Sequence, residues 1–141
     1  MTGMKSGRGK LDANNKKSNS VSYHKPLGSY THVRRAKPGI MLFVSGQVSV
    51  DSNGSVIGKN NAKVQVRQAI ENLRRVLHSE GASLQNVMKT TWYLTDIRVR
   101  KEVNSVYSKY FKTPYPASTL VVVKELAVRD LVVEVDAIAV V

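Results

Sequence analysis

The sequence predicts an α+β domain in which two helices pack on one face of a mixed β-sheet. Two stretches, 61–79 and 98–111, place apolar residues at helical spacing. The stretch 131–141 alternates from residue to residue as a strand does. The 141 residues fit a single domain, which at this length buries roughly 68–70% of the surface of its unfolded chain.

The chain begins with a basic stretch that is expected to stay outside the domain. Residues 1–19 consist mainly of Gly, Ser, Asn and Lys, and they predict a disordered tail because they hold too few apolar groups to offset the entropy of ordering. Residues 1–37 carry nine Lys and Arg and one acid, so they hold +8 of the net charge of +12. Residues 38–141 carry thirteen cations and nine acids and are therefore only mildly basic, at +4. The basic tail predicts weak non-specific attraction to nucleic-acid phosphates.

Three strands are expected before the first helix. Residues 21–24 and 30–35 are short and polar, which is typical of edge strands, and 40–44 is apolar enough to be buried. The alternating pattern continues over 47–50 and returns over 55–57, with Asn-Gly between them, a strong signal for a hairpin.

Helices and strands then follow in turn. The first helix, 61–79, has an expected buried face of Val66, Ala69, Ile70, Leu73, Val76 and Leu77, and Gly81 suits its C-terminal end. The stretch 87–94 favours a strand because it is rich in Thr and aromatic residues. The second helix, 98–111, has an expected apolar side of Val99, Val103, Val106, Tyr107 and Tyr110.

Two strands close the chain, 119–123 and 131–141, which makes the predicted order βββαβαββ. One face of the last strand is wholly apolar and is expected to be buried: Leu131, Val133, Val135, Ala137, Ala139 and Val141. Its other face places Glu134 and Asp136 among three aliphatic residues.

Several function classes are excluded by residue types or spacing. The chain has no Cys, so disulfides, Cys-containing zinc sites and thiol nucleophiles are ruled out. The three His show no metal-ligand spacing, Ser45 lacks the G-x-S-x-G elbow, and Gly54–Asn60 has the wrong spacing for a phosphate loop. No apolar run reaches bilayer length and no secretory signal is visible, so a cytoplasmic protein without a membrane partner is expected, with organellar import left open.

Asp136 is the best candidate for chemistry. A carboxylate in the middle of a strong strand loses hydration unless it is hydrogen-bonded or faces a cavity. Glu134 lies about 7 Å away on the same face by strand geometry, close enough for the two carboxylates to act as a pair. The alternative is that this face is partly solvated, as one side of an antiparallel sheet often is. Asn104 is a second candidate, because it lies at the edge of the apolar side of its helix.

Five motifs in this order and spacing resemble the RidA/YjgF family of imine and enamine deaminases, over about residues 22–141. They are Leu42–Gln47, Arg67–Leu73, Val87–Asp96, Val103–Tyr107 and Val135–Ala139. The resemblance implies a chorismate-mutase-like α+β fold and a homotrimer with clefts between its subunits. It also implies hydrolysis of reactive enamines or imines to 2-keto acids and ammonia, with no metal or organic cofactor.

The resemblance also implies roles for individual residues. Asp136 matches the family's acidic residue, which is usually Glu, and would be the catalytic group that handles water and protons. The substrate-binding positions would be Tyr30, Ser45, Gly46, Asn104 and Thr119.

The chain departs from the family at the residue that binds the substrate carboxylate. The family's usual run is Pro-Ala-Arg-Ser-Thr, whereas this chain has Pro116-Ala117-Ser118-Thr119. Either the Arg is deleted or Ala117 occupies its substrate-binding slot, and altered substrate preference is expected because a bidentate Arg–carboxylate contact is strong and geometrically specific. Two alternatives remain: a non-catalytic trimer that binds a small metabolite, and an RNA-binding or ribonuclease-type translation inhibitor.

Overall fold

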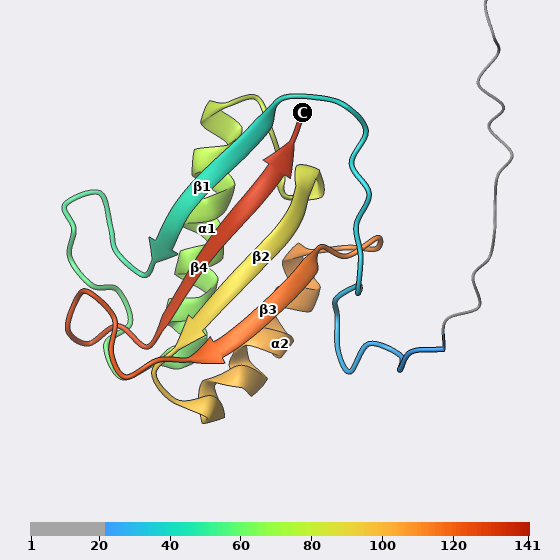
Figure 1. Ribbon diagram of the computed structural model, residues 1–141. Coiled ribbons are helices and arrows are strands. Elements are labelled where there is room, and N and C mark those ends of the chain that lie inside the picture. Colours follow the sequence, from blue (N-terminus) through green and yellow to red (C-terminus); the bar gives the residue numbers. More distant parts are fainter. Residues whose placement is uncertain (1–21) are drawn as a thin grey trace, which may run out of the picture.

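The structure, a computed structural model, describes residues 22–141, and the predicted tail over 1–19 lies outside them. The described chain forms one four-stranded sheet with two helices on one face, while the other face of the sheet is open (Figure 1). The predicted α+β class and the placement of both helices on one face are confirmed.

The sheet is mixed, with strand order β1-β4-β2-β3. The strands are β1 (Met41–Val48), β2 (Val87–Leu94), β3 (Ala117–Val122) and β4 (Val133–Val140). Strand β4 runs antiparallel to both β1 and β2, whereas β2 and β3 are parallel. Strands β1 and β3 are therefore the two edges of the sheet, the full width of the sheet apart.

The strands predicted over 21–24, 30–35 and 55–57 are wrong for the described residues. In these segments only isolated bridges form, from Thr31 to Ala117 and from Val50 to Val56. Segments this polar have no continuous apolar face to bury, so a ladder gains little by extending. The regular elements of residues 22–141 thus run strand, helix, strand, helix, strand, strand.

The Asn-Gly turn itself is present at the end of the β1 segment. The Asp51 carboxylate accepts hydrogen bonds from the backbone N–H of Asn53 and of Ser55, both at 2.9 Å. Gly54 has a φ of 80°, which favours glycine. The predicted turn is confirmed although the second strand of the hairpin is reduced to one bridge.

Helix α1 (Ala62–Ser79) begins at Asn61, whose side chain accepts a hydrogen bond from the Val64 N–H at 3.1 Å. Beyond its end, Gly81 takes a φ of 70°, as the sequence predicts. Its buried face is Gln65, Val66, Ala69, Ile70, Leu73 and Leu77. Val76, predicted on this face, is 38% exposed because it lies at the margin of the apolar arc.

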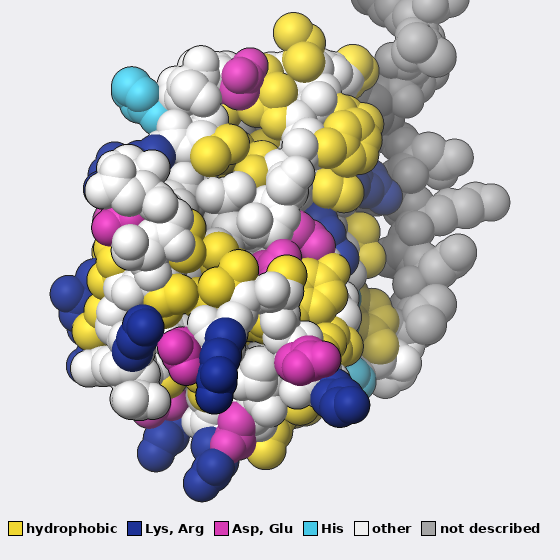
Figure 2. Space-filling model, turned by 90° about the vertical axis from the view of Figure 1, so that its left-hand side faces the viewer, with side chains coloured by type: hydrophobic (Ala, Val, Ile, Leu, Met, Phe, Trp, Pro, Cys, Tyr) yellow, Lys and Arg dark blue, Asp and Glu magenta, His cyan; other side chains and the backbone are white. Residues whose placement is uncertain are grey.

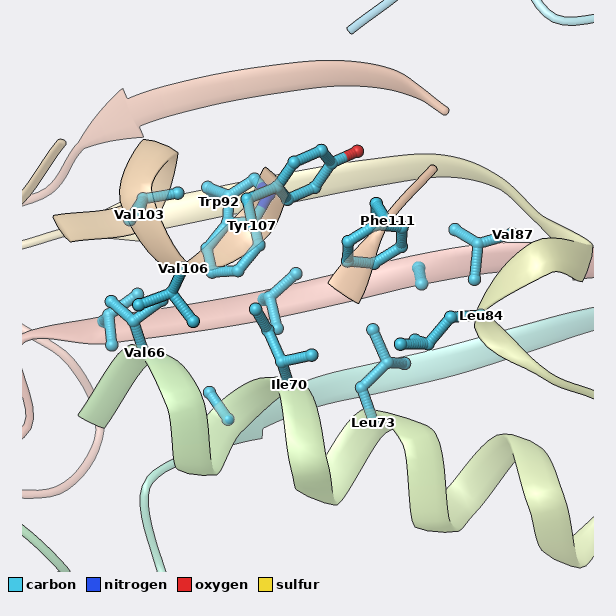
Figure 3. Packing of buried hydrophobic residues seen from close by; sticks show 14 of the residues in the cluster. Val66, Ile70, Leu73, Leu84, Val87, Trp92, Val103, Val106, Tyr107 and Phe111 are labelled. Carbon is cyan, nitrogen blue, oxygen red and sulfur yellow. The ribbon is translucent and has the colours of Figure 1, made fainter. Parts of the chain in front are cut away.

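Helix α2 (Arg100–Tyr110) follows a short 3₁₀ turn over Ile97–Val99. Its buried residues, Val103, Val106 and Tyr107, meet Trp92 of β2 and the apolar face of α1 in one core (Figure 3). The apolar face predicted for the last strand is buried from Leu131 to Ala139, but Val141 is exposed at the chain end. No helix among residues 22–141 is long and apolar enough to cross a membrane.

Candidate functional site

The open face of the sheet carries a carboxylate pair at its centre. Glu134 and Asp136 of β4 are both half-buried there. Asp136 Oδ2 accepts a hydrogen bond from Tyr93 Oη at 2.8 Å, and this bond raises the pKa of Tyr93. A carboxylate held in this way has a fixed orientation, so the side chain of Asp136 is a positioned group rather than a freely rotating one.

A lysine lies beside this pair. Lys89 of β2 donates from Nζ to Thr119 Oγ1 at 2.7 Å and to the Thr90 carbonyl at 2.9 Å. Partial burial lowers the pKa of Lys89, while the charge of Asp136 acts in the opposite direction. The open face therefore holds a cation, two carboxylates and two hydroxyl groups within reach of one another.

Strand β1 contributes a backbone irregularity next to the carboxylates. The pairing of β1 with β4 shifts register between Val44 and Gln47, so Ser45 and Gly46 lie in a bulge. A Cβ atom added to Gly46 would lie 1.7 Å from Glu134 Oε1. Ser45 and Gly46 line a hollow of about 450 Å³ together with Asp136. The acid that lies against Gly46 is Glu134, whereas Asp136 is the acid that lines the hollow.

A separate cleft of about 320 Å³ lies on the other side of the sheet, between α2, β3 and the segment before β1. Its polar lining comes from Ser29, Tyr30, Arg100, Asn104, Tyr107 and Ser118, and its apolar lining from Leu27, Trp92, Ile97, Val103 and Leu120. This mixture of apolar walls and a few polar groups is typical of a site for a small molecule.

Hydroxyl side chains of β2, β3 and α2 lie in or next to this cleft. Thr90 Oγ1 donates to Ser118 Oγ at 3.0 Å. Tyr107 is only 4% exposed, and its Oη makes no hydrogen bond to any of residues 22–141, although Thr90 lies close enough to affect it. Burial raises the pKa of Tyr107 far above its usual range. Figure 3 shows this hydroxyl on the side of the core away from α1.

The residues predicted for one site thus fall into two groups. Asp136, Ser45 and Gly46 line the hollow on the open face, and Ala117 and Thr119 share that face with Lys89 by the register of β2 and β3. Tyr30 and Asn104 line the cleft on the helix side instead. At β3 it is Ser118, the residue after the Pro-Ala pair, that lines this cleft, and Ala117 lies on the opposite face.

The structure adds residues to these two places that were not among the predicted site residues. Glu134, which strand alternation already pairs with Asp136, is the carboxylate that lies against Gly46. Lys89 alternates with Thr91 and Tyr93 in the same way. Arg100 and Ser118 carry no such signal, because their place in the cleft depends on how α2 packs against β3.

The open face also exposes large apolar side chains. Phe43 of β1 is 73% exposed, and Met41 and Val121 are exposed on the same face. Figure 2, which views the molecule from the β1 side, shows exposed hydrophobic patches toward the open face with acidic side chains among them. An apolar face with charged groups set into it marks a surface for association.

The described residues do not bring three His, Asp or Glu side chains together in a way that could hold a metal ion. The polar groups of both places are instead donors and acceptors suited to a small organic molecule and to water.

Comparisons with known proteins agree with this architecture. The family model for endoribonuclease L-PSP matches residues 22–141. A RutC family protein of Pyrococcus abyssi is 39% identical over 115 residues, which cover 82% of this chain and 88% of that protein. A RutC family protein of Saccharolobus solfataricus is 40% identical over 116 residues, covering 82% of this chain and 89% of the relative.

Among solved structures, RidA from the Antarctic bacterium Psychrobacter sp. PAMC 21119 superposes with a TM-score of 0.68 at 29% identity. The match covers 83% of this chain and 92% of that one. The region matched by the family model, residues 22–141, contains both the open face and the cleft.

Proposed function

This chain belongs to the endoribonuclease L-PSP family, the RidA/YjgF family, and on that premise we propose that it hydrolyses a reactive enamine or imine metabolite in the cytoplasm. The observation that carries the proposal is the Glu134 carboxylate lying against Gly46, beside an Asp136 that is oriented by Tyr93. A pair of positioned carboxylates next to exposed backbone is suited to moving protons between water and a small substrate.

The chemistry requires water and a proton shuttle but no redox partner. Water adds to the carbon of the C=N bond, and a carboxylate takes the proton that the water loses. That proton is passed to nitrogen, which gives a carbinolamine. A second proton then moves from the hydroxyl group of the carbinolamine to its nitrogen, the C–N bond breaks, and ammonia and the keto product are released. Asp136 is the proposed group for this transfer, with Glu134 as the carboxylate nearest to the Ser45–Gly46 bulge.

A homotrimer would join the two groups of site residues. Ser45 and Gly46 belong to edge strand β1, whereas Ser118, which lines the cleft, belongs to edge strand β3. In a closed ring, the β1 side of one subunit meets the β3 side of the next, which brings the carboxylate hollow of one copy to the cleft of another. The exposed Phe43 and its apolar neighbours supply the surface that such contacts would bury.

The test is release of ammonia and keto product from a panel of enamines and imines generated in the assay, including 2-aminoacrylate and aminomuconate-like compounds. We expect turnover of at least one member, and a fall of about 100-fold or more in Asp136→Asn and in Glu134→Gln if both carboxylates act. Thr95→Val, a change outside both places, is the control.

Absence of ammonia release from every compound would reject the enzymatic proposal and favour the alternative of a non-catalytic trimer that binds a small metabolite. Turnover that is unchanged in both carboxylate variants would reject the roles of Glu134 and Asp136 while leaving the activity itself in place.

RNA binding is a second candidate because of the charge distribution along the chain. Residues 1–37 hold +8 of the net charge of +12. Removal of residues 1–19 takes away five cations and one acid, so RNA affinity should fall and its dependence on salt should flatten. Affinity that is the same after removal would place any RNA contact on residues 20–141.

A further inference from the structure

The cleft contains a cation that makes no ion pair with any of residues 22–141. Arg100, the first residue of α2, lines the cleft and is exposed. Its neighbour Arg98 differs, because it is bound to the Asp96 carboxylate through both Nε and Nη2. Since arginine stays charged at all relevant pH values, the mouth of the cleft carries a permanent positive charge with free donors.

Arg100 lines the same cleft as a residue of β3 at the place where the chain departs from the family's usual run. The residue that follows Pro116-Ala117 is Ser118, and its side chain lies in this cleft. Where the family's usual run has Arg after Pro-Ala, this chain has a short hydroxyl side chain, which leaves room in the cleft. Arg100 reaches the same cleft from α2, so the cation comes from the helix instead of from the strand.

The rest of the cleft is suited to an organic acid. Asn104 offers an amide group one helical turn beyond Arg100, so the two side chains lie on the same face of α2. The Tyr107 hydroxyl is buried without a hydrogen-bond partner among the described residues, a state that is unfavourable unless a polar group or water supplies one. Trp92, Val103 and Leu120 provide apolar walls.

We propose that Arg100 is the carboxylate-binding residue of this cleft, and that its ligand is a small monocarboxylate whose apolar part lies against Trp92 and Leu120. The proposal rests on the proposed function, because it assigns the substrate anchor of the same site. It makes Arg100 a specificity-determining residue that acts in place of an arginine on β3.

Binding can be measured without any turnover. Trp92 is the single tryptophan of the chain and lines the cleft, so its fluorescence reports on the occupant. The full-length protein is titrated with butyrate, 2-oxobutyrate and butyramide, and calorimetry repeats each titration. Both acids should bind, the neutral amide should bind at least about tenfold more weakly, and acid binding should weaken as salt rises.

The decisive variant is Arg100→Gln. Loss of a charge-assisted contact should reduce acid affinity by about 10- to 150-fold, while affinity for butyramide should stay the same. Arg100→Lys should keep part of the acid affinity, because the charge remains but the bidentate geometry is lost. Lys101→Gln is the matched control, since it removes the same charge one residue further along α2 and does not line the cleft.

Equal acid affinity in wild type and Arg100→Gln would overturn the proposal, and so would equal binding of butyrate and butyramide or no acid binding by either method. Failure of the Arg100 proposal can be distinguished from failure of the proposed enzymatic function. Acid binding through Arg100 without ammonia release rejects the enzymatic activity alone, whereas turnover with an unchanged kcat/KM in Arg100→Gln rejects only the anchor.

Discussion

At Gly46 the need for glycine comes from a neighbouring side chain and not from the backbone. Its φ is not among the positive values, which occur at Gly54, Gly58 and Gly81. A Cβ atom would instead meet the carboxylate of Glu134. The glycine thus lets a carboxylate approach the β1 bulge more closely than any other residue would permit.

Gly46→Ala should therefore destabilise the protein through Glu134. Because the obstructing atom is the end of a flexible side chain, the expected loss in unfolding free energy is about 1 kcal/mol, at the lower end of the cost of overpacking. In a Glu134→Ala background the same change should cost close to nothing, since the obstruction is gone. Urea denaturation of the four proteins of this cycle measures the coupling. Equal costs in both backgrounds would contradict the contact.

The packing of helix α1 on the sheet depends on a narrow set of its residues. In α1, Leu73 is fully buried at 0% exposure, whereas Val76, less than one turn away, is 38% exposed. Helical spacing alone groups the two, and packing against the sheet separates them.

Leu73→Ala should lower the unfolding free energy by about 2–5 kcal/mol, because it removes a buried side chain and leaves a cavity. Val76→Ala on the same helix should cost less than about 1 kcal/mol, since its side chain is already partly in water and Ala has the higher helix propensity. Chemical denaturation compares the two. A larger loss for Val76→Ala would mean that another surface covers this part of α1.

The 3₁₀ turn over Ile97–Val99, which leads into α2, begins at Asp96. Its side chain accepts a hydrogen bond from the Arg98 N–H at 2.8 Å, and the Arg98 guanidinium lowers the pKa of Asp96 to about 2 through hydrogen bonds to the carboxylate. Because the pKa in the folded state lies below its usual value of 3.8, the charged form stabilises the folded state above about pH 4. That contribution is lost as the pH falls toward 2.

Asp96→Asn keeps an N-capping side chain but removes the charge. The variant should be less stable than wild type at pH 6, and the difference should shrink between pH 4 and pH 2, where Asp96 in wild type becomes protonated. Urea denaturation across this range is the measurement. A difference that stays constant with pH would show that the ion pair contributes nothing to stability.

At the scale of the whole molecule, we expect the open face of the sheet to be covered by another subunit. A sheet with helices on only one side exposes Phe43 and other apolar side chains on the other. A charge placed at the centre of a buried interface without a partner is costly, so one substitution there can separate subunits.

Light scattering of the wild type should give three times the chain mass of 15.6 kDa, and Phe43→Glu should shift it toward the monomer. Val76→Glu, on the helix side of the sheet, should leave the mass unchanged and serves as the control. If the wild-type protein is monomeric at micromolar concentration, the proposal of a site shared between subunits is rejected. If the Phe43→Glu variant remains a trimer, the interface between subunits does not include Phe43 at the β1 edge.

Periodicity and turn residues in the sequence determined most of the fold. The apolar arcs of α1 and α2 and the alternation of β4 predicted where these elements lie, because burial of an apolar face governs local structure. The short strands over 30–35 and 55–57 were predicted wrongly, since a strand that lacks an apolar face depends on partners that local sequence does not reveal. The motifs also indicated the family and the residues Tyr30, Ser45, Gly46, Asn104, Thr119 and Asp136 as site candidates.

Only the tertiary structure decided how those residues are grouped. The sheet separates Asp136 and Gly46 from Tyr30 and Asn104, because neighbouring residues of one strand point to opposite faces and the two helices cover only one of them. The same alternation puts Ser118 rather than Ala117 in the cleft, and the packing of α2 on β3 brings Arg100 there from 18 positions earlier in the chain. Such contacts depend on how elements pack in space, and no local pattern in the sequence encodes them.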